Sequence, residues 1–287
     1  MPSTRLGCLP IDDDRLAADL STLSKARFTD AYAEFAFGLW RTLMVRNYDG
    51  TDEDAVIRMY HRPAVETLVG HTLPYLRKLI DDHFDASRLR YARIMKIECN
   101  AGVIPHRDYL EFSEPYIRLH LPIQTDENCM NSEGGQVLHL CKGEVWYLDA
   151  AQIHSAVSFS KKPRMHLVMD FAGGVSPISL VRNCAFAIGN PAPIYRPKMP
   201  DSVKEAIKSL GCVLDECNLM DVISILCKLH FKYQSEPECV FEWLADMARV
   251  DDLGTLGKRI EFLELECIKA RSGGRLSENA AGISLAS

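Results

Sequence analysis

Two good metal ligands stand close together in the stretch IPHRDYLEF, residues 104–112. His106 and Asp108 are two residues apart, and residues two apart in a strand point to the same side. His154, in DAAQIHSAV on a later predicted strand, is the best candidate for a third ligand. Two histidines and one carboxylate form a facial triad that leaves coordination positions open, an arrangement suited to iron. The pattern predicts a catalytic metal site; the competing interpretation is two surface residues in a turn and a core histidine.

Inward-pointing arginines indicate an anion near this site. In PRMHLVMDF, Arg164 and His166 share one face of a predicted strand, opposite a row of apolar residues. Arg118 and His120, in IRLHL, repeat this arrangement on another predicted strand. A buried guanidinium needs an anion because an unpaired buried charge is very costly, and its planar fork suits a carboxylate. The alternative is that each strand turns one polar face outward to solvent.

A further arginine interrupts an apolar pattern. In LRYARIMKI, Arg93 shares a face with Leu89, Tyr91, Met95 and Ile97. A charge within an apolar face is an informative departure from the usual distribution. It either holds the carboxylate of a substrate or forms a structural salt bridge, and the residues alone leave both interpretations open.

The elements that must position these residues follow the order helices, strands, helices. Leucine spacing predicts helices over residues 12–24 and 72–84. From about residue 88, seven short alternating runs over about 85 residues predict a sandwich or barrel, with a jelly roll as the natural candidate. After a proline-rich connector at 189–200, the helical period returns and continues to about residue 270.

Composition sets further limits. The chain has 287 residues, 47% of them hydrophobic and 25% charged, as expected for a globular protein with ample core. A net charge of -6 argues against a general nucleic-acid binder. No apolar run is long enough for a signal peptide or a membrane span. The ten cysteines form no CxxC pair, which favours reduced, buried thiols and a cytoplasmic location.

Several motifs together resemble one enzyme family. IPHRDYLE, YIRLHL, GEVWYLDAAQIHSA and PRMHLVMD are similar to the Fe(II)/2-oxoglutarate-dependent hydroxylases of free L-proline. These belong with the aspartyl/asparaginyl β-hydroxylase-like branch of the double-stranded β-helix oxygenases. YAEFAFGLW and the part around ILCKLHF resemble the same group, so the resemblance runs from about residue 5 to about residue 270. RYARI and HRDYLE look closer to the cis-4-hydroxylases than to the cis-3-hydroxylases.

The resemblance implies a fold and an activity. The fold would be a mainly β core with helices, a double-stranded β-helix (jelly roll, cupin-like) with N-terminal helices and a helical C-terminal region. The oxygenase domain would span residues 1–190 and the helical region residues 200–287. The reaction would hydroxylate L-proline at C4 (cis) and release succinate and CO2. It would use Fe(II), 2-oxoglutarate and O2, with ascorbate as a supporting reductant.

The resemblance also implies a role for each position that matches a motif. The three predicted metal ligands match the iron triad, and Arg164 matches the arginine that holds the distal carboxylate of 2-oxoglutarate. Arg118 and His120 match the R-x-H near the metal-bound end of this cosubstrate, although one of them could serve the substrate instead. The candidates for the amino-acid pocket are Arg93, Tyr32, Trp40 and Phe112. The turn NCMNSEGG could border the site and leaves the size of the substrate open.

Rival interpretations remain within and outside this chemistry. The substrate could be L-pipecolate, another free amino acid or a residue in a peptide, and hydroxylation could fall on C3 of proline. A non-catalytic metal-binding cupin is the alternative of another class, and His-Asp-His ligation is also compatible with a zinc hydrolase. A small-molecule substrate is expected, with no nucleic acid and no membrane. The oligomeric state is open, a homodimer included.

Overall fold

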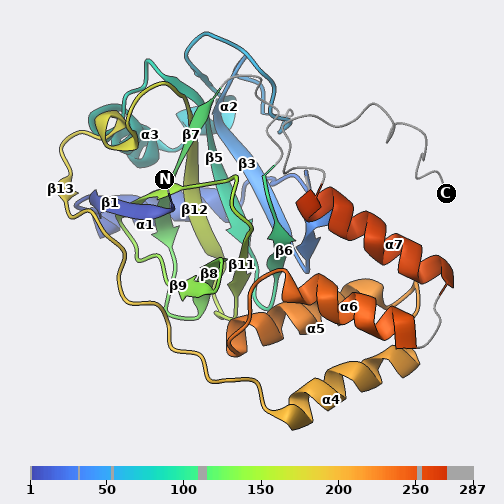
Figure 1. Ribbon diagram of the computed structural model, residues 1–287. Coiled ribbons are helices and arrows are strands. Elements are labelled where there is room, and N and C mark those ends of the chain that lie inside the picture. The colour runs from blue at the N-terminus through green and yellow to red at the C-terminus, as the bar shows by residue number, and fades with distance from the viewer. Residues whose placement is uncertain (1, 32, 53–54, 109–114, 251–253, 270–287) are drawn as a thin grey trace.

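Two antiparallel β-sheets form the centre of the computed structural model, which describes residues 2–31, 33–52, 55–108, 115–250 and 254–269 (Figure 1). The larger sheet has the order β13-β1-β10-β7-β12-β5-β3-β4, and the smaller one has the order β2-β6-β11-β8-β9. The larger sheet contains Thr4–Cys8 (β1), Trp40–Asn47 (β3), Val65–Glu66 (β4), Leu89–Ile97 (β5), Tyr116–Gln124 (β7), Glu144–Leu148 (β10), Arg164–Ala172 (β12) and Ala185–Phe186 (β13). The smaller sheet contains Ala36–Phe37 (β2), Gly102–His106 (β6), Cys129–Glu133 (β8), Gln136–Leu138 (β9) and His154–Ser158 (β11).

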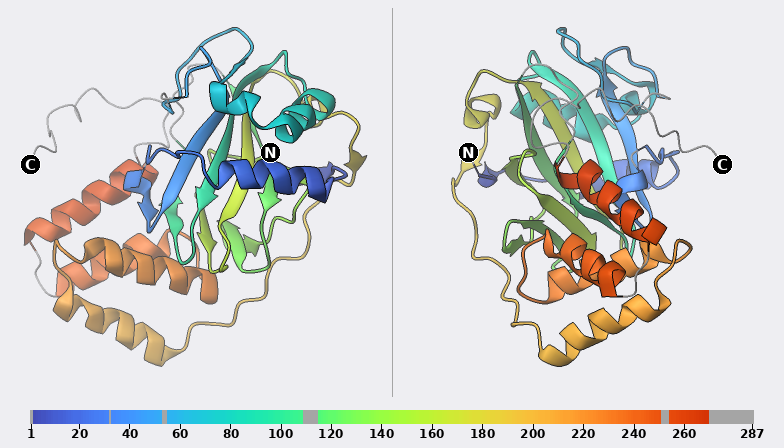
Figure 2. Two further views of the ribbon diagram at one scale, coloured as in Figure 1. Left: turned by 180° about the vertical axis from the view of Figure 1, so that it is seen from behind. Right: turned by 45° about the vertical axis from the view of Figure 1, so that its right-hand side comes forward.

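Helices cover both outer faces of this pair of sheets (Figures 1 and 2). The α-helices are Asp13–Leu23 (α1), Leu68–His71 (α2), Pro74–His83 (α3), Asp201–Ser209 (α4), Leu219–Lys232 (α5), Cys239–Val250 (α6) and Gly254–Glu264 (α7). Short 3-10 turns lie at Ala33–Phe35 (η1), Pro177–Leu180 (η2) and Leu210–Val213 (η3), and a π-helical turn lies at Leu265–Lys269 (η4).

The strands β5 to β12 form a jelly roll. In chain order they pass from the larger sheet to the smaller and back, with β8 and β9 as a hairpin within the smaller sheet. This produces the central orders β10-β7-β12-β5 and β6-β11-β8-β9, the arrangement of a double-stranded β-helix. The predicted fold class, a mainly β core with N-terminal helices and a helical C-terminal region, is confirmed.

The alternation of residues along the strands explains the layers. On β7 and β12, Leu119, Leu121 and Leu167 point outward into a core with α1 and α3. Figure 2 (left) shows α1 lying across this face of the larger sheet. Each fully buried leucine of this kind contributes about 2 kcal/mol through removal of apolar surface from water. The opposite faces of the same strands carry the charged residues and turn toward the smaller sheet.

The C-terminal helices pack on the smaller sheet. Ile104 of β6 and Val157 of β11 share a hydrophobic core with Leu226 of α5 and Phe241 of α6. Arg196, in the connector, is buried and donates hydrogen bonds to the carbonyls of His230, Tyr233 and Gly135, among others. These bonds join the end of α5 to the β8–β9 turn. The helical region is therefore attached both by apolar packing and by a buried guanidinium.

Other expectations need correction. The predicted helices at 12–24 and 72–84 are present as α1 and α3, but the N-terminal strands β1 to β4 were not predicted from the sequence. The stretch expected as a turn at NCMNSEGG contains strand β8. The ten cysteines are free as predicted, but five of them are exposed rather than buried. Within the described part of the chain, no helix has the length and apolar character to cross a membrane.

Candidate active site

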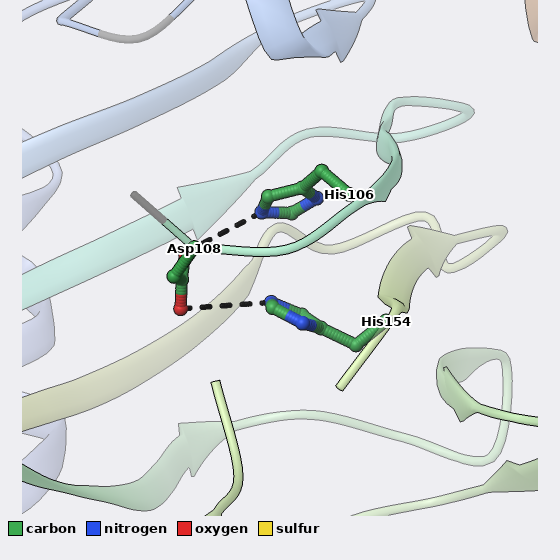
Figure 3. A group of neighbouring side chains, drawn as sticks. All are labelled: His106, Asp108 and His154. Carbon is green, nitrogen blue, oxygen red and sulfur yellow. Dashed lines mark ion pairs between the residues drawn. The ribbon is translucent and has the colours of Figure 1, made fainter. Parts of the chain in front are cut away.

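The three predicted metal ligands lie together at one end of the smaller sheet (Figure 3). His106 ends β6, Asp108 follows two residues later, and His154 begins β11 directly opposite His106 in the strand register. Nε2 of His106 is 3.5 Å from one carboxylate oxygen of Asp108, and Nε2 of His154 is 3.7 Å from the other. One ligand atom from each residue lies within 4.8 Å of the other two, so one cation could contact all three.

The backbone fixes how both imidazoles face this point. Nδ1 of His106 bonds to the carbonyl of Ile104 at 2.8 Å, and Nδ1 of His154 bonds to the carbonyl of Gln152 at 2.9 Å. A carbonyl only accepts, so each Nδ1 carries the hydrogen and each Nε2 presents its lone pair to the cluster. This tautomer is the one that metal coordination through Nε2 needs.

Electrostatics keep the cluster ready to bind a cation. Burial, reinforced by the neighbouring His106, lowers the pKa of His154 to about 4, so this imidazole is neutral at physiological pH. Burial opposes ionisation of Asp108, but the Arg118 guanidinium and the two histidines hold the pKa of its carboxyl well below the usual range. The set therefore offers two imidazole nitrogens, of which that of His154 is neutral, and one carboxylate.

Backbone hydrogen bonds hold the segment between the ligands in place. The N–H of Arg107 donates to the carbonyl of Cys267 in η4 at 2.9 Å, and the N–H of Asp108 donates to the carbonyl of Ala150 at 2.9 Å. The ring of Phe35 stacks on His106 with centroids 6.1 Å apart. The C-terminal helical region thus contacts the metal-ligand segment directly.

A row of buried charges crosses the inner face of the larger sheet. Arg118 donates from Nε to Oδ1 of Asp170 at 2.7 Å and from Nη2 to Oδ2 at 3.2 Å. Its remaining terminal nitrogen, Nη1, contacts Oδ2 of Asp108. On the other side of Asp170, Nη2 of Arg93 lies 3.4 Å from Oδ2. The charged row therefore runs from the predicted metal ligand Asp108, through Arg118 on β7 and Asp170 on β12, to Arg93 on β5.

A second polar group lies farther along the same face. Nη2 of Arg164 donates to Oδ1 of Asn131 at 2.9 Å and lies 3.2 Å from Nδ1 of His166. Nδ1 of His120 is 3.4 Å from the same nitrogen of His166. Burial and the nearby arginines hold the pKa of both histidines well below the usual value, so neither carries a charge that could pair with an anion.

Arg164 is a buried cation without an acidic partner among the described residues. The residue is 3% exposed, and its Nε has no hydrogen-bond partner within the described ranges. Burial lowers the pKa of its guanidinium to about 10, which still leaves it charged at neutral pH. An unpaired buried cation is costly, so this position favours an anionic ligand.

The inward orientation predicted for the arginines is confirmed, with one correction that concerns Leu89. Arg93 and Arg118 are buried between the sheets. The expected salt bridge and the expected substrate role of Arg93 are not exclusive, because its single contact with Asp170 is long. Leu89 does not share the face of Arg93, since a register shift between β5 and β12 turns it into the outer core.

Of the four residues predicted to line the amino-acid pocket, the structure describes Arg93 and Trp40. Trp40 is buried between the sheets beside Ile97 of β5, four residues along β3 from Met44, which pairs with Arg93. Tyr32 and Phe112 lie outside the described residues. The roles assigned to all of these side chains, and to the metal and cosubstrate residues, stay predictions.

Two polar residues of the site were missed from the sequence. Asp170 continues the alternation of Arg164, His166 and Val168, so extending that pattern by one step would have placed it on the charged face. Asn131 lies in the stretch that was expected to be a turn bordering the site. Its contact with Arg164 joins strands of different sheets, and no local pattern signals such a contact.

Comparison with known families gives two matches that divide the chain. A profile described as aspartyl/asparaginyl beta-hydroxylase matches residues 11–173, which include helix α1 and all strands of the jelly roll. A second profile, described as L-proline 3-hydroxylase, C-terminal, matches residues 182–276.

Two relatives named as L-proline hydroxylases align with most of the chain. An L-proline cis-4-hydroxylase from Rhizobium meliloti (strain 1021) is 40% identical over 245 residues, which are 85% of this chain and 88% of the relative. An L-proline cis-3-hydroxylase from Streptomyces sp is 33% identical over 258 residues, 87% of this chain and 89% of the relative. Among solved structures, the non-heme alpha ketoglutarate dependent carbocyclase SnoK is 10% identical with a TM-score of 0.41, covering 66% of this chain and 92% of that one.

Proposed function

This chain belongs to the aspartyl/asparaginyl β-hydroxylase family, and we propose that it is a 2-oxoglutarate-dependent dioxygenase that hydroxylates free L-proline. The single observation that carries the proposal is the composition of the interior. A His-Asp-His cluster and a buried arginine without an acidic partner among the described residues both lie close enough to His120, on the inner face of the larger sheet, to act on its charge.

The cluster fits Fe(II). His106, Asp108 and His154 would hold the metal, because two imidazoles and one carboxylate are the ligand set that iron oxygenases use. The fixed tautomers of both histidines support this assignment. When bound, iron with 2-oxoglutarate and O2 supplies the chemistry that replaces a C–H bond by C–OH and leaves succinate and CO2. Ascorbate would serve to keep the metal reduced.

Arg164 fits the distal carboxylate of 2-oxoglutarate. The guanidinium is buried, and its partners Asn131 and His166 are neutral, so a bound carboxylate would supply the missing negative charge. His120 lies beside His166, and with Arg118 it would border the other end of the cosubstrate. The chain's own contribution to this step is to orient the cosubstrate and to exclude water.

The amino acid would bind near Arg93. A zwitterionic imino acid needs a cation for its carboxylate, and Nε of Arg93 has no hydrogen-bond partner among the described residues. Trp40, Tyr32 and Phe112 stay our candidates for the walls around the ring. The higher identity to the cis-4-hydroxylase supports C4 (cis) over C3, which is the position named for the Streptomyces relatives. The free cysteines support a cytoplasmic location.

An assay with defined components tests the proposal. Purified protein, Fe(II), ascorbate and 2-oxoglutarate would be incubated with L-proline, L-pipecolate and a panel of other amino acids, with succinate and product mass as readouts. We expect succinate to form with L-proline in step with a product that has gained one oxygen, and His106→Ala to abolish both. If the wild-type protein with metal bound oxidises no amino acid and leaves succinate at background, a peptide substrate or a non-catalytic cupin takes precedence.

A further inference from the structure

Asp170 is a buried carboxylate that the proposed reaction does not yet use. It has an exposed fraction of 0% and lies on β12, the strand between β7 and β5 in the larger sheet. In the register it faces Arg118 on β7 and Tyr91 on β5, with Arg93 two residues along β5. One carboxylate is thus flanked by a guanidinium from each neighbouring strand.

The two arginines are held very differently. Arg118 makes two hydrogen bonds to Asp170, contacts Asp108, and lies over the ring of Tyr116 at 5.3 Å. Arg93 has one contact with Asp170 at 3.4 Å, and among the residues that the structure describes its buried Nε finds no hydrogen-bond partner. Arg118 is therefore held by several groups of the protein, whereas Arg93 has one long ion pair and a buried Nε without a hydrogen-bond partner in the described part of the chain.

We propose that Asp170 is a positioning residue that separates the roles of these two arginines, clamping Arg118 onto the metal ligand Asp108 and aiming Arg93 at the carboxylate of the amino-acid substrate. The inference rests on the proposed function. The reasoning is electrostatic and geometric. Without the carboxylate, two buried guanidiniums on the strands that flank Asp170 would repel each other, and neither would keep a fixed direction. With it, Arg118 is neutralised in place, and Arg93 keeps a planar fork for a second carboxylate.

Kinetics and binding of two Asp170 variants test this role. Asp170→Asn keeps the shape and removes the charge, and Asp170→Glu keeps the charge but moves the carboxylate by one methylene group. In both, we expect the KM for L-proline to rise about tenfold or more, because the substrate carboxylate is no longer aligned. The KM for 2-oxoglutarate should rise by no more than about threefold, because only Arg118 at one end of the cosubstrate is disturbed, while Arg164 at the other end does not contact Asp170.

A binding measurement on the same variants avoids turnover altogether. Calorimetry with Mn(II) and 2-oxoglutarate, without O2, gives the Kd for L-proline, which should rise by the same factor as the KM. Leu167→Ala is the matched control, because Leu167 is a fully buried residue of the same strand that points into the outer core. This control should lower the thermal midpoint and leave both KM values near those of the wild type.

A third variant keeps the test sharp if the Asp170 variants do not fold. Arg93→Lys retains the charge and leaves the Asp170–Arg118 pair in place, and it should weaken L-proline binding about tenfold without affecting 2-oxoglutarate. The inference is overturned if Asp170→Glu or Arg93→Lys binds L-proline as the wild type does, or if the KM for 2-oxoglutarate rises by as much as the KM for L-proline. If the wild-type protein forms no succinate with any amino acid, the proposed function itself fails.

Discussion

At the scale of single residues, neutral imidazoles and opposed charges prepare the site before any ligand binds. The Nδ1 hydrogen bonds of His106 and His154 select the tautomer, and Arg118 keeps Asp108 ionised. Arg164 is the exception, because its charge has no acidic partner among the described residues. Such a charge destabilises the ligand-free protein and is relieved when an anion binds.

This difference predicts opposite effects of one substitution. Arg164→Met should raise the free energy of unfolding of the ligand-free protein by about 1 kcal/mol, since it removes an unpaired buried charge. The same change should raise the KM for 2-oxoglutarate about a hundredfold, because charge-assisted hydrogen bonds to a carboxylate are lost. Urea unfolding and steady-state kinetics measure the two effects.

The control for this test is Arg182→Met, which alters an exposed arginine paired with Asp85 at the surface. It should change neither quantity by a measurable amount. A KM for 2-oxoglutarate that stays within about twofold of wild type in Arg164→Met would remove Arg164 from the cosubstrate site.

At the scale of elements, sequence patterns identified those strands that have one apolar and one polar face. The alternation in IRLHL and PRMHLVMDF correctly placed Arg118, His120 and Arg164 on β7 and β12. Strand β3 was not predicted because nearly all of its residues are buried, so WRTLMVRN shows no alternation of apolar and polar residues. Asn131 was not predicted as a site residue because its partner Arg164 belongs to the other sheet, and contacts between sheets depend on the complete fold.

The C-terminal helices carry a buried histidine that makes the protein sensitive to acid. His230 of α5 is fully buried; Nδ1 bonds to Ser235, and Nε2 has no partner among the described residues. Burial, with the nearby Arg196, lowers its pKa to about 3. The unfolded chain, with a histidine pKa of about 6.5, therefore takes up the proton first, and stability falls as pH drops from about 6.5 toward 3.

A comparison of pH profiles measures this contribution. Between pH 6.5 and 5, the wild type should lose about 2 kcal/mol of unfolding free energy more than His230→Gln does. Urea unfolding at several pH values gives the slopes, and His61→Gln, at an exposed position, is the control that should follow the wild type. Identical slopes for His230→Gln and wild type would contradict a buried neutral imidazole.

At the scale of the whole molecule, the site lies between two sheets that are each braced on the outside. The helices α1 and α3 cover the larger sheet, and the C-terminal helices cover the smaller one (Figure 2). The predicted division into residues 1–190 and 200–287 stays a prediction. The shared core and the contact of Cys267 with Arg107 favour a helical region that supports the metal-ligand segment instead of acting separately.

The most direct test of the central claim is the structure of the product formed from L-proline under isotopically labelled O2, determined by NMR and mass spectrometry. The account predicts cis-4-hydroxy-L-proline with the label in its hydroxyl group and one succinate for each product molecule. Hydroxylation at C3 would contradict the assignment of C4. An unlabelled product, or unchanged L-proline with active metal-loaded protein, would contradict the claim that this interior hydroxylates free proline.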